Sequence, residues 1–150
     1  MEFKDLQINE QILNGIARKE FTTLTEIQEK VIPFALSGKD LLGQAPTGTG
    51  KTLAFTIPIL DKIDEEKRVC QALIIAPTRE LAMQITSDIN EISYYMNVKA
   101  VTLYGGELID KQITALRRKP QVIVATPGRL LDHVNRETCL LYTSPSPRDA

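Results

Sequence analysis

The sequence predicts an α/β domain in which a parallel β-sheet is flanked by helices. From residue 40 onward, short apolar runs alternate with segments of helical apolar spacing, and Gly or Pro follows each run. The apolar runs are 41–42, 72–76, 98–104 and 122–125, and the helical segments are 51–63, 79–95 and 108–118. Such alternation is typical of parallel sheets, and the near-continuous Ile, Val and Leu in two runs indicates strands buried on both faces.

Length, charge and cysteine content exclude several classes of protein. A chain of 150 residues forms one ordinary domain at most, and a formal net charge of -1 gives no global positive field for a polyanion. No apolar stretch approaches the roughly 20 residues needed to span a bilayer, so no membrane partner is expected. Cys70 and Cys139 show neither a disulfide pattern nor metal-ligand spacing, which favours a reducing cytoplasm.

Two amphipathic helices are predicted ahead of the alternating region. The first covers 9–19, with Asn9 as its N-cap and Gly15 as a weak point. The second covers 26–36 and contains Pro33, which is expected to bend it.

The turn after the first apolar run has the composition of a phosphate-binding loop. It reads Ala45, Pro46, Thr47, Gly48, Thr49, Gly50, Lys51 and Thr52. The two glycines let the backbone bend so that N–H groups point inward, and a helix starting near Lys51 directs its positive end at the same point. Glycine-rich turns also occur without nucleotides, and the common pattern begins with Gly where this chain has Ala45.

The chemistry of this loop suits a nucleoside triphosphate bound with Mg²⁺. Lys51 is expected to neutralise the β and γ phosphates, and the Thr52 hydroxyl is expected to ligate the Mg²⁺ ion that bridges them. These two residues are therefore the candidate catalytic pair, with Thr52 as the candidate metal ligand.

Three further turns should lie at the same edge of the sheet, because every run is followed by its turn at the carboxyl end of a parallel strand. They are 77–79, 105–106 and 126–129. Thr78 and Thr126 are placed to cap helices that begin with Arg79 and Pro127, leaving N–H groups for an anion. The alternative is that both threonines are only good helix starters.

In order and spacing, these motifs resemble those of the first RecA-like domain of the DEAD-box ATP-dependent RNA helicases. The resemblance covers residues 1–138 and includes a motif at 20–28 that ends in Gln28. It implies an incomplete RecA-like P-loop NTPase domain that uses ATP and Mg²⁺. The intact parent would contain a second RecA-like domain and couple ATP hydrolysis to local unwinding of RNA duplexes.

The resemblance also implies roles for individual residues. Phe3 would stack on adenine, Gln28 would read the adenine edge, and Thr25 would support the phosphate loop. The RNA sugar-phosphate backbone would be contacted by the three other turns, through Pro77, Thr78, Arg79, Gly105, Gly106, Thr126, Pro127, Gly128 and Arg129. Contacts to the backbone alone carry no preference for sequence.

The chain departs from the family pattern at two places. Glu20 and Leu24 replace the Gly and Pro usual in the motif at 20–28, so that loop is expected to be held less rigidly. Beyond residue 136 the family continues into strands carrying Asp-Glu-Ala-Asp and Ser-Ala-Thr, which the resemblance places between the phosphate-loop strand and the strand ending at Ala76. Because these strands hold Mg²⁺ and orient water, the 150-residue chain alone is not expected to hydrolyse ATP.

Residues 139–150 are expected to be a non-native tail. Back-translated, they resemble the transposase adapter used in sequencing libraries, read through in frame. The alternative is a natural, disordered Ser/Pro-rich tail.

Other polar and aromatic residues are given structural roles. His133, the only histidine, is expected to be a solvated side chain, and Tyr94 and Tyr95 are expected to lie in the core rather than offer a base-stacking surface. The basic cluster at 117–119 is interpreted as a helix C-terminus. Two function classes stay open: a helicase fragment, and a module that binds nucleotide or RNA without turnover. A third class, a P-loop ATPase acting on DNA or protein, is disfavoured by the Gln28 motif and the turn at 126–129.

Overall fold

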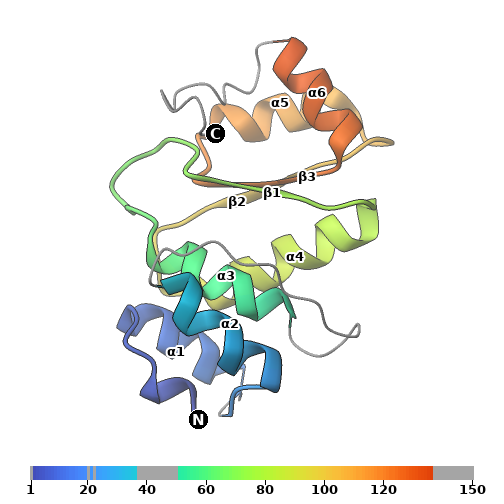
Figure 1. Cartoon of the computed structure of the whole chain (residues 1–150). Helices are drawn as coiled ribbons and strands as arrows, with labels where there is room; N and C mark the ends of the chain where they lie inside the picture. The colour runs from blue at the N-terminus through green and yellow to red at the C-terminus, as the bar shows by residue number, and fades with distance from the viewer. Residues whose placement is uncertain (1, 20, 22, 37–50, 137–150) are drawn as a thin grey trace. The chain divides into compact units, whose positions relative to one another are not determined.

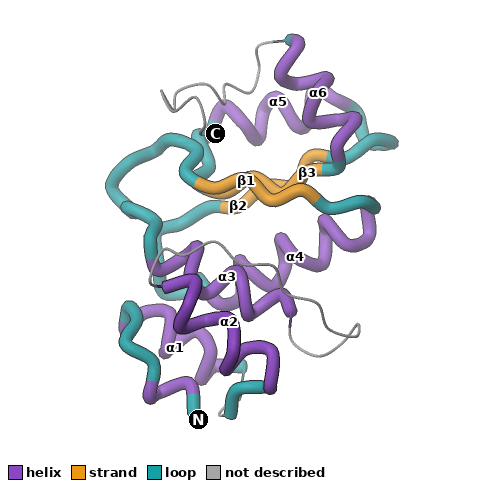
Figure 2. The backbone as a smooth tube through the Cα atoms, in the orientation of Figure 1, coloured by secondary structure: helices purple, strands orange, loops and turns teal. Residues whose placement is uncertain are grey.

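The computed structural model describes residues 2–19, 21, 23–36 and 51–136 of the chain. Its contacts divide it into two units. The first, called here the N-terminal unit, comprises Met1–Glu66 and Ser87–Val98, and the second, called the sheet unit, comprises Lys67–Thr86 and Lys99–Ala150. Figure 2 shows the three strands of the described residues side by side, and by their residue ranges they belong to the sheet unit.

The N-terminal unit is a layer of helices. It contains the 3-10 helix η1 (Phe3–Asp5), then α1 (Glu10–Arg18), α2 (Glu26–Leu36) and α3 (Lys51–Asp61), together with the second half of α4 (Arg79–Ile92). The helices predicted at 9–19, 26–36 and 51–63 are confirmed, and the ends that do not border the undescribed residues 37–50 agree within two residues. The N-cap prediction is also confirmed, because Asn9 Oδ1 accepts a hydrogen bond of 2.7 Å from the Gln11 amide.

Gly15 is a packing position of α1 and not a weak point, which corrects the prediction. The helix continues through Gly15, and the residue is buried. A Cβ atom built at this position would lie 1.9 Å from the carbonyl oxygen of Ile92, at the end of α4. Only a residue without a side chain allows the two helix backbones to approach this closely.

The sheet unit confirms the predicted parallel sheet. Its strands are β1 (Ala72–Ile75), β2 (Ala100–Leu103) and β3 (Val122–Ala125), in the order β1-β3-β2 with both pairs parallel. The first half of α4 lies on one face, and α5 (Ile109–Arg117) and α6 (Pro127–Asn135) lie on the other (Figure 1). The apolar run at 41–42, predicted as a further strand, lies outside the described residues.

The core of the sheet unit centres on β3, whose four residues are all buried. On the face of α5 and α6, Leu103, Ile123 and Ala125 form an apolar cluster, against which Cys70, Val101, Leu116 and Leu130 pack. On the other face, the Thr102 hydroxyl bonds to the Thr86 hydroxyl of α4 at 2.7 Å. Strand β1 is covered less completely, since Leu73 is 37% exposed and Ile75 is 49% exposed.

The tyrosine pair of the N-terminal unit contradicts the sequence expectation. Tyr94 and Tyr95 were expected in the core, but their exposed fractions are 59% and 48%. They follow the end of α4 and contact each other edge to face, with ring centroids 5.0 Å apart. The Arg18 guanidinium lies 3.7 Å from the centre of the Tyr94 ring, so a cation covers one face of this aromatic surface.

Candidate functional site

Three of the four predicted ligand-binding turns follow strand ends that are aligned with one another in the sheet. Ile75 and Leu103 are both paired with Ala125, so the last residues of the three strands are in register. Neighbouring strands lie about 4.8 Å apart, and the central strand is β3. The turn at 126–129 is therefore flanked by the turns at 77–79 and 105–106. This places nine of the predicted RNA-contacting residues at one edge of the sheet unit.

The turn after β1 has the predicted helix cap. The Thr78 hydroxyl oxygen accepts a hydrogen bond of 3.2 Å from the Leu81 amide, and α4 begins at Arg79. Pro77, Thr78 and Arg79 are all exposed. The Arg79 guanidinium lies 5.6 Å from the centre of the Tyr104 ring, which positions this cation beside the turn that follows β2.

The glycine pair after β2 forms an exposed turn. Gly106 has φ +94°, a backbone conformation that side chains rarely adopt, so this position favours glycine. An added Cβ would lie 3.5 Å from Nη1 of Arg79, which is an ordinary contact distance. The requirement for glycine thus comes from the backbone angle and not from a lack of space.

The turn after β3 starts α6 as predicted, but its threonine acts differently. Pro127 is the first residue of the helix and Thr126 occupies the N-cap position. The predicted side-chain cap is wrong, because the Thr126 hydroxyl makes no capping bond and instead lies 3.5 Å from the Leu103 carbonyl oxygen. The Thr126 amide donates to the same oxygen at 2.9 Å. Thr126 therefore ties this turn to the end of β2.

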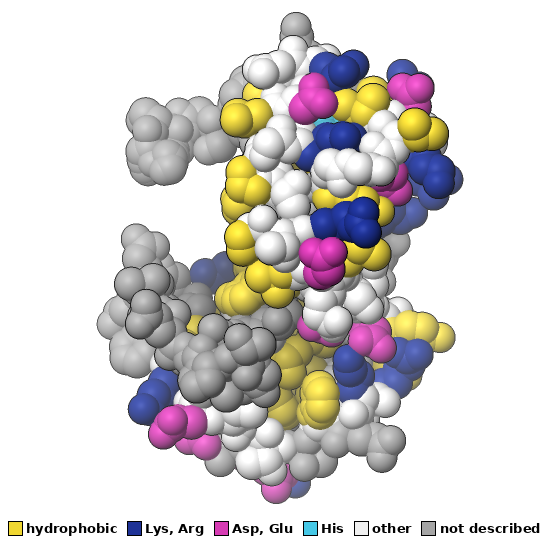
Figure 3. Space-filling model, turned by 90° about the vertical axis from the view of Figure 1, so that its right-hand side faces the viewer, with side chains coloured by type: hydrophobic (Ala, Val, Ile, Leu, Met, Phe, Trp, Pro, Cys, Tyr) yellow, Lys and Arg dark blue, Asp and Glu magenta, His cyan; other side chains and the backbone are white. Residues whose placement is uncertain are grey.

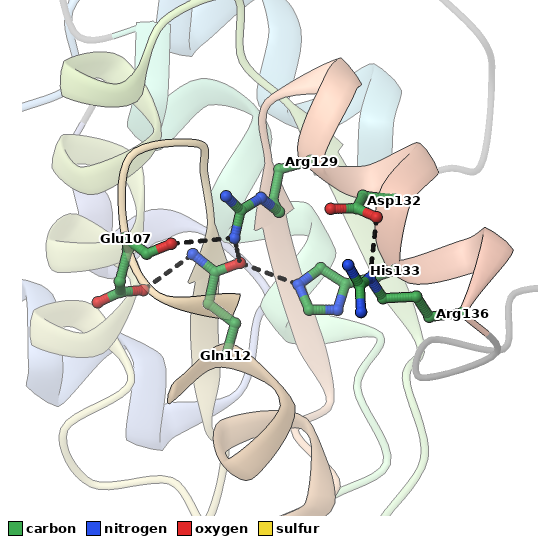
Figure 4. Close-up of polar contacts among 6 residues, drawn as sticks. All are labelled: Glu107, Gln112, Arg129, Asp132, His133 and Arg136. Atoms are coloured by element: carbon green, nitrogen blue, oxygen red, sulfur yellow. Dashed lines mark hydrogen bonds and ion pairs between the residues drawn. The ribbon is translucent and has the colours of Figure 1, made fainter. Parts of the chain in front are cut away.

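Gln112 connects the turn at 105–106 to α6, and the sequence analysis did not select it. Its Nε2 group donates to the Tyr104 carbonyl oxygen and to Glu107 Oε1, both at 2.8 Å. Its Oε1 atom accepts from Arg129 Nη1 at 3.3 Å and lies 2.9 Å from His133 Nε2 (Figure 4). Arg129 Nη1 also donates to the Glu107 carbonyl oxygen at 3.2 Å. Spacing alone gave no signal for Gln112, since a lone glutamine on an amphipathic helix is common.

His133 is fully buried, which contradicts the expectation of a solvated side chain. Because the Gln112 Oε1 atom carries no hydrogen, the short contact assigns the proton of His133 to Nε2. Burial lowers the pKa of His133 below its ordinary value, and the positive charge of Arg129 lowers it further against the opposing effect of Asp132. The ring is therefore held neutral and serves as a hydrogen-bond donor inside the unit.

Asp132 and Arg136 form an ion pair on the outer side of α6. The distance from Arg136 Nε to Asp132 Oδ1 is 3.0 Å, and both side chains are about half exposed. The hydrogen bond from Arg136 is the main reason that the pKa of Asp132 lies below its usual value. An exposed pair of this kind contributes little to stability.

Gln28, the predicted adenine-reading residue, is hydrogen-bonded to Thr25 at the start of α2. Its exposed fraction is 2%, and its Oε1 atom accepts a hydrogen bond of 2.8 Å from the Thr25 amide. In return, the Thr25 hydroxyl lies 3.4 Å from the Gln28 amide. Threonine followed three residues later by glutamine is the capping-box pattern, a sequence signal for a helix start.

Phe3, the predicted stacking residue, is also buried, with 4% of its surface exposed. It lines a cleft of about 180 Å³ in the N-terminal unit, together with Glu2, Lys4, Leu13, Ile16, Ala17 and Phe21. Phe21 is 42% exposed and therefore presents the larger aromatic surface.

The phosphate-binding motif lies mostly outside the described residues. Ala45, Pro46, Thr47, Gly48, Thr49 and Gly50 belong to that undescribed part. Helix α3 is described from Lys51 onward, in agreement with the helix predicted at 51–63. A helix N-terminus at this point would suit a polyphosphate ligand, because its backbone N–H groups attract anions. Lys51 and Thr52 stay the predicted partners of such a ligand and its Mg²⁺, and their side chains lie outside what the structure describes.

The described residues show no metal-binding cluster, and one face of the molecule carries charges of both signs. Among them, His, Cys, Asp and Glu form no group that could hold a metal ion. On the face drawn in Figure 3, Lys and Arg side chains are interspersed with Asp and Glu. Within the part of the chain that the structure describes, no helix has the length and apolar character needed to cross a membrane.

Fold and motifs together define a helicase-type P-loop domain. A sequence model of the DEAD/DEAH box helicase family matches residues 25–144, most of the chain. The chain belongs to this family. The match runs beyond residue 138 into the segment that the sequence analysis interpreted as a non-native tail.

Relatives and solved structures agree with this family. The chain is 49% identical over 140 residues to the ATP-dependent RNA helicase CshA of Listeria monocytogenes, and 46% identical over 139 residues to the DEAD-box ATP-dependent RNA helicase CshA of Geobacillus kaustophilus. Each alignment covers 93% of this chain, but only 27% and 30% of those relatives. The chain thus spans less than a third of their length.

Among solved structures, the fold is similar to a DEAD box protein from the hyperthermophile Methanococcus jannaschii, with a TM-score of 0.88 and 42% identity. That alignment covers 94% of this chain and 39% of the solved chain. A hypothetical ATP-dependent RNA helicase from Sulfolobus tokodaii matches with a TM-score of 0.80 and 40% identity, over 91% of this chain and 39% of the other. These similarities agree with the predicted RecA-like fold and with a chain that contains only part of a longer protein.

Proposed function

We propose that this chain is the amino-terminal part of an ATP-dependent RNA helicase and that its sheet unit grips the RNA sugar-phosphate backbone. The observation that carries the proposal is the row of three turns at the ends of β1, β3 and β2. Two arginines lie close to the exposed glycine turn: Arg79 Nη1 is near Gly106, and Arg129 Nη1 donates to the Glu107 carbonyl oxygen. Cations and backbone amides at helix starts bind phosphates without reading bases.

The nucleotide site of the same protein would be built around α3 and the residues before it. Residues 45–52 would surround the phosphates of ATP, Lys51 would neutralise them, and Thr52 would hold Mg²⁺. The bound metal supplies positive charge at the phosphates. Gln28 and Phe3 are proposed to select adenine, and a second RecA-like domain in the longer parent would complete the site.

RNA binding is tested most directly at the arginines. In the full-length parent, Arg79→Ala and Arg129→Ala should each weaken binding of a single-stranded RNA, by a similar factor for different sequences. Each should also reduce the slope of log K against log salt concentration by about 0.7, the effect of one phosphate contact. The control is Arg117→Ala at the exposed end of α5. Unchanged RNA affinity in both variants would contradict the proposal.

Enzyme activity is tested by the release of phosphate. The parent should release phosphate from ATP faster with RNA present, and Lys51→Ala should abolish that stimulation. The 150-residue chain alone should show no RNA-stimulated release above the same Lys51→Ala control. A parent that binds both ligands and shows no turnover would instead identify the protein as a binding module.

A further inference from the structure

The buried side-chain amide of Gln112 joins two of the proposed RNA-contacting elements, the turn at 105–106 and helix α6. Gln112 has an exposed fraction of 1%, and it lies on α5 between the turn at 105–106 and the start of α6. Its side chain has two N–H donors and one oxygen that can accept two hydrogen bonds. All four capacities are used: the two donors bind Tyr104 and Glu107, and the oxygen accepts from Arg129 and His133.

The chemistry of these neighbours fixes the orientation of the amide. A carbonyl oxygen and a carboxylate face the NH₂ group, and both can only accept. A guanidinium faces the oxygen, and it can only donate. Rotating the amide by 180° would place like groups against each other on both sides. The amide therefore has one stable orientation, and it connects the glycine turn to Arg129 (Figure 4).

Burial makes this connection energetically important. Gln112 and His133 are both excluded from water, so a partner lost from either would leave a polar atom without a replacement from solvent. The backbone carbonyl of Glu107 also accepts from Arg129, so the turn and the guanidinium are joined directly as well as through the amide. These two hydrogen bonds hold the Nη1 atom of Arg129 against the Glu107 carbonyl oxygen and Gln112 Oε1.

We propose that Gln112 is a positioning residue that holds Arg129 and the turn at Gly105–Gly106 at a fixed spacing, so that both meet the RNA backbone together. The inference rests on the proposed function, because it takes the RNA contacts of Arg129 and of the glycine turn as given. Gln112 itself touches no ligand in this assignment. It acts by limiting the freedom of a long, flexible cation, which lowers the entropy lost when that cation binds a phosphate.

The decisive experiment is a double-mutant cycle in the full-length parent, with Gln112→Leu, Arg129→Ala and both together. The probe is a fluorescein-labelled single-stranded oligouridylate, followed by anisotropy and by RNA-stimulated phosphate release. Gln112→Leu should raise the RNA concentration for half-maximal stimulation about five- to tenfold, with kcat at saturating RNA changed less than about twofold. When Arg129→Ala is already present, Gln112→Leu should change the RNA concentration for half-maximal stimulation by less than about twofold, because Gln112 acts through Arg129.

Two controls separate positioning from a general structural role. Gln84→Leu makes the same substitution at an exposed site on α4. It should leave unchanged both the RNA concentration for half-maximal stimulation and kcat at saturating RNA. The affinity for a fluorescent ATP analogue should also be unchanged in Gln112→Leu. If Gln112→Leu weakens ATP and RNA binding by the same factor, or weakens RNA binding equally with and without Arg129, the proposal is overturned.

If Gln112→Leu does not fold, a second pair of substitutions, Gln112→Glu and Glu107→Gln, tests the same proposal. Gln112→Glu keeps the acceptor facing Arg129 but places a carboxylate against Glu107 and the Tyr104 carbonyl. This variant should weaken RNA binding, and adding Glu107→Gln should restore at least half of the loss, since an amide donor then faces the new carboxylate. Absence of rescue would overturn the proposal. If Arg129→Ala itself leaves RNA binding unchanged, the RNA assignment of Arg129 fails, which is a separate result.

Discussion

Several of the residues selected for ligand binding differ in exposure between the two units. In the sheet unit, Arg79 and the Gly105–Gly106 pair are exposed at the ends of strands. In the N-terminal unit, Phe3 and Gln28 are buried, and Gln28 caps a helix. The turns of a parallel sheet lie outside its core, so they are free to carry ligand chemistry. A residue between packed helices serves the fold first, so substitutions there change stability and binding together.

The largest effect is expected from removing the rest of the domain. A fragment of residues 1–138 should be aggregated or molten, because β1 would keep an unpaired edge beside Leu73 and Ile75, which are already partly exposed. The loss should exceed the roughly 5–15 kcal/mol by which domains are stable. Extending the fragment through the Ser-Ala-Thr strand should restore a cooperative melt. A sharp, reversible transition for 1–138 would show that the strand order implied by the resemblance is wrong.

The next largest effect should come from Gly15, in the N-terminal unit. Gly15→Ala should lower the free energy of unfolding of the parent by about 3 kcal/mol or more, because the new methyl group would overlap the Ile92 carbonyl. Gly128→Ala in α6 is the matched control for stability, since a Cβ there meets nothing within 4 Å. It should be neutral or stabilising by up to about 1 kcal/mol. Equal thermal melts for the two variants would contradict the close helix contact.

Gln28 allows capping and base recognition to be separated. Gln28→Ala should weaken ATP binding, erase the preference for ATP over GTP, and cost about 1 kcal/mol of stability through the lost cap. Gln28→Glu keeps the acceptor of a capping box and should lose the base preference with a smaller change in stability. Equal binding of ATP and GTP by the unmutated parent would count against adenine recognition by Gln28.

The smallest effect is a pH dependence from His133 in the sheet unit. Its pKa is lowered in the folded state, so below about pH 6.5 the unfolded chain binds a proton that the folded chain does not. Stability should therefore fall as pH decreases through 6.5, by at most about 1.4 kcal/mol per pH unit. The charged side chains that affect this ring are Arg129, Asp132 and Arg136. Chemical denaturation between pH 5 and pH 8 should show this slope, and His133→Leu should remove it.

The α/β fold, the parallel strands and the helix starts at Arg79 and Pro127 could be predicted from the sequence. These follow from local signals, namely apolar periodicity and turn residues, which act over a few positions of the chain. The sequence predicted only that the turns share one edge of the sheet. The structure gives the register, in which Ile75, Ala125 and Leu103 are paired across the three strands.

Tertiary packing sets which polar residues are buried and which aromatic residues are exposed. His133 and Gln112 lie on different helices, so their contact depends on how α5 and α6 pack on the sheet. The exposure of Tyr94 and the close approach at Gly15 likewise depend on how α1 meets the end of α4. Burial is a property of packing between segments distant in sequence, and local periodicity carries no information about the partner that covers a given side chain.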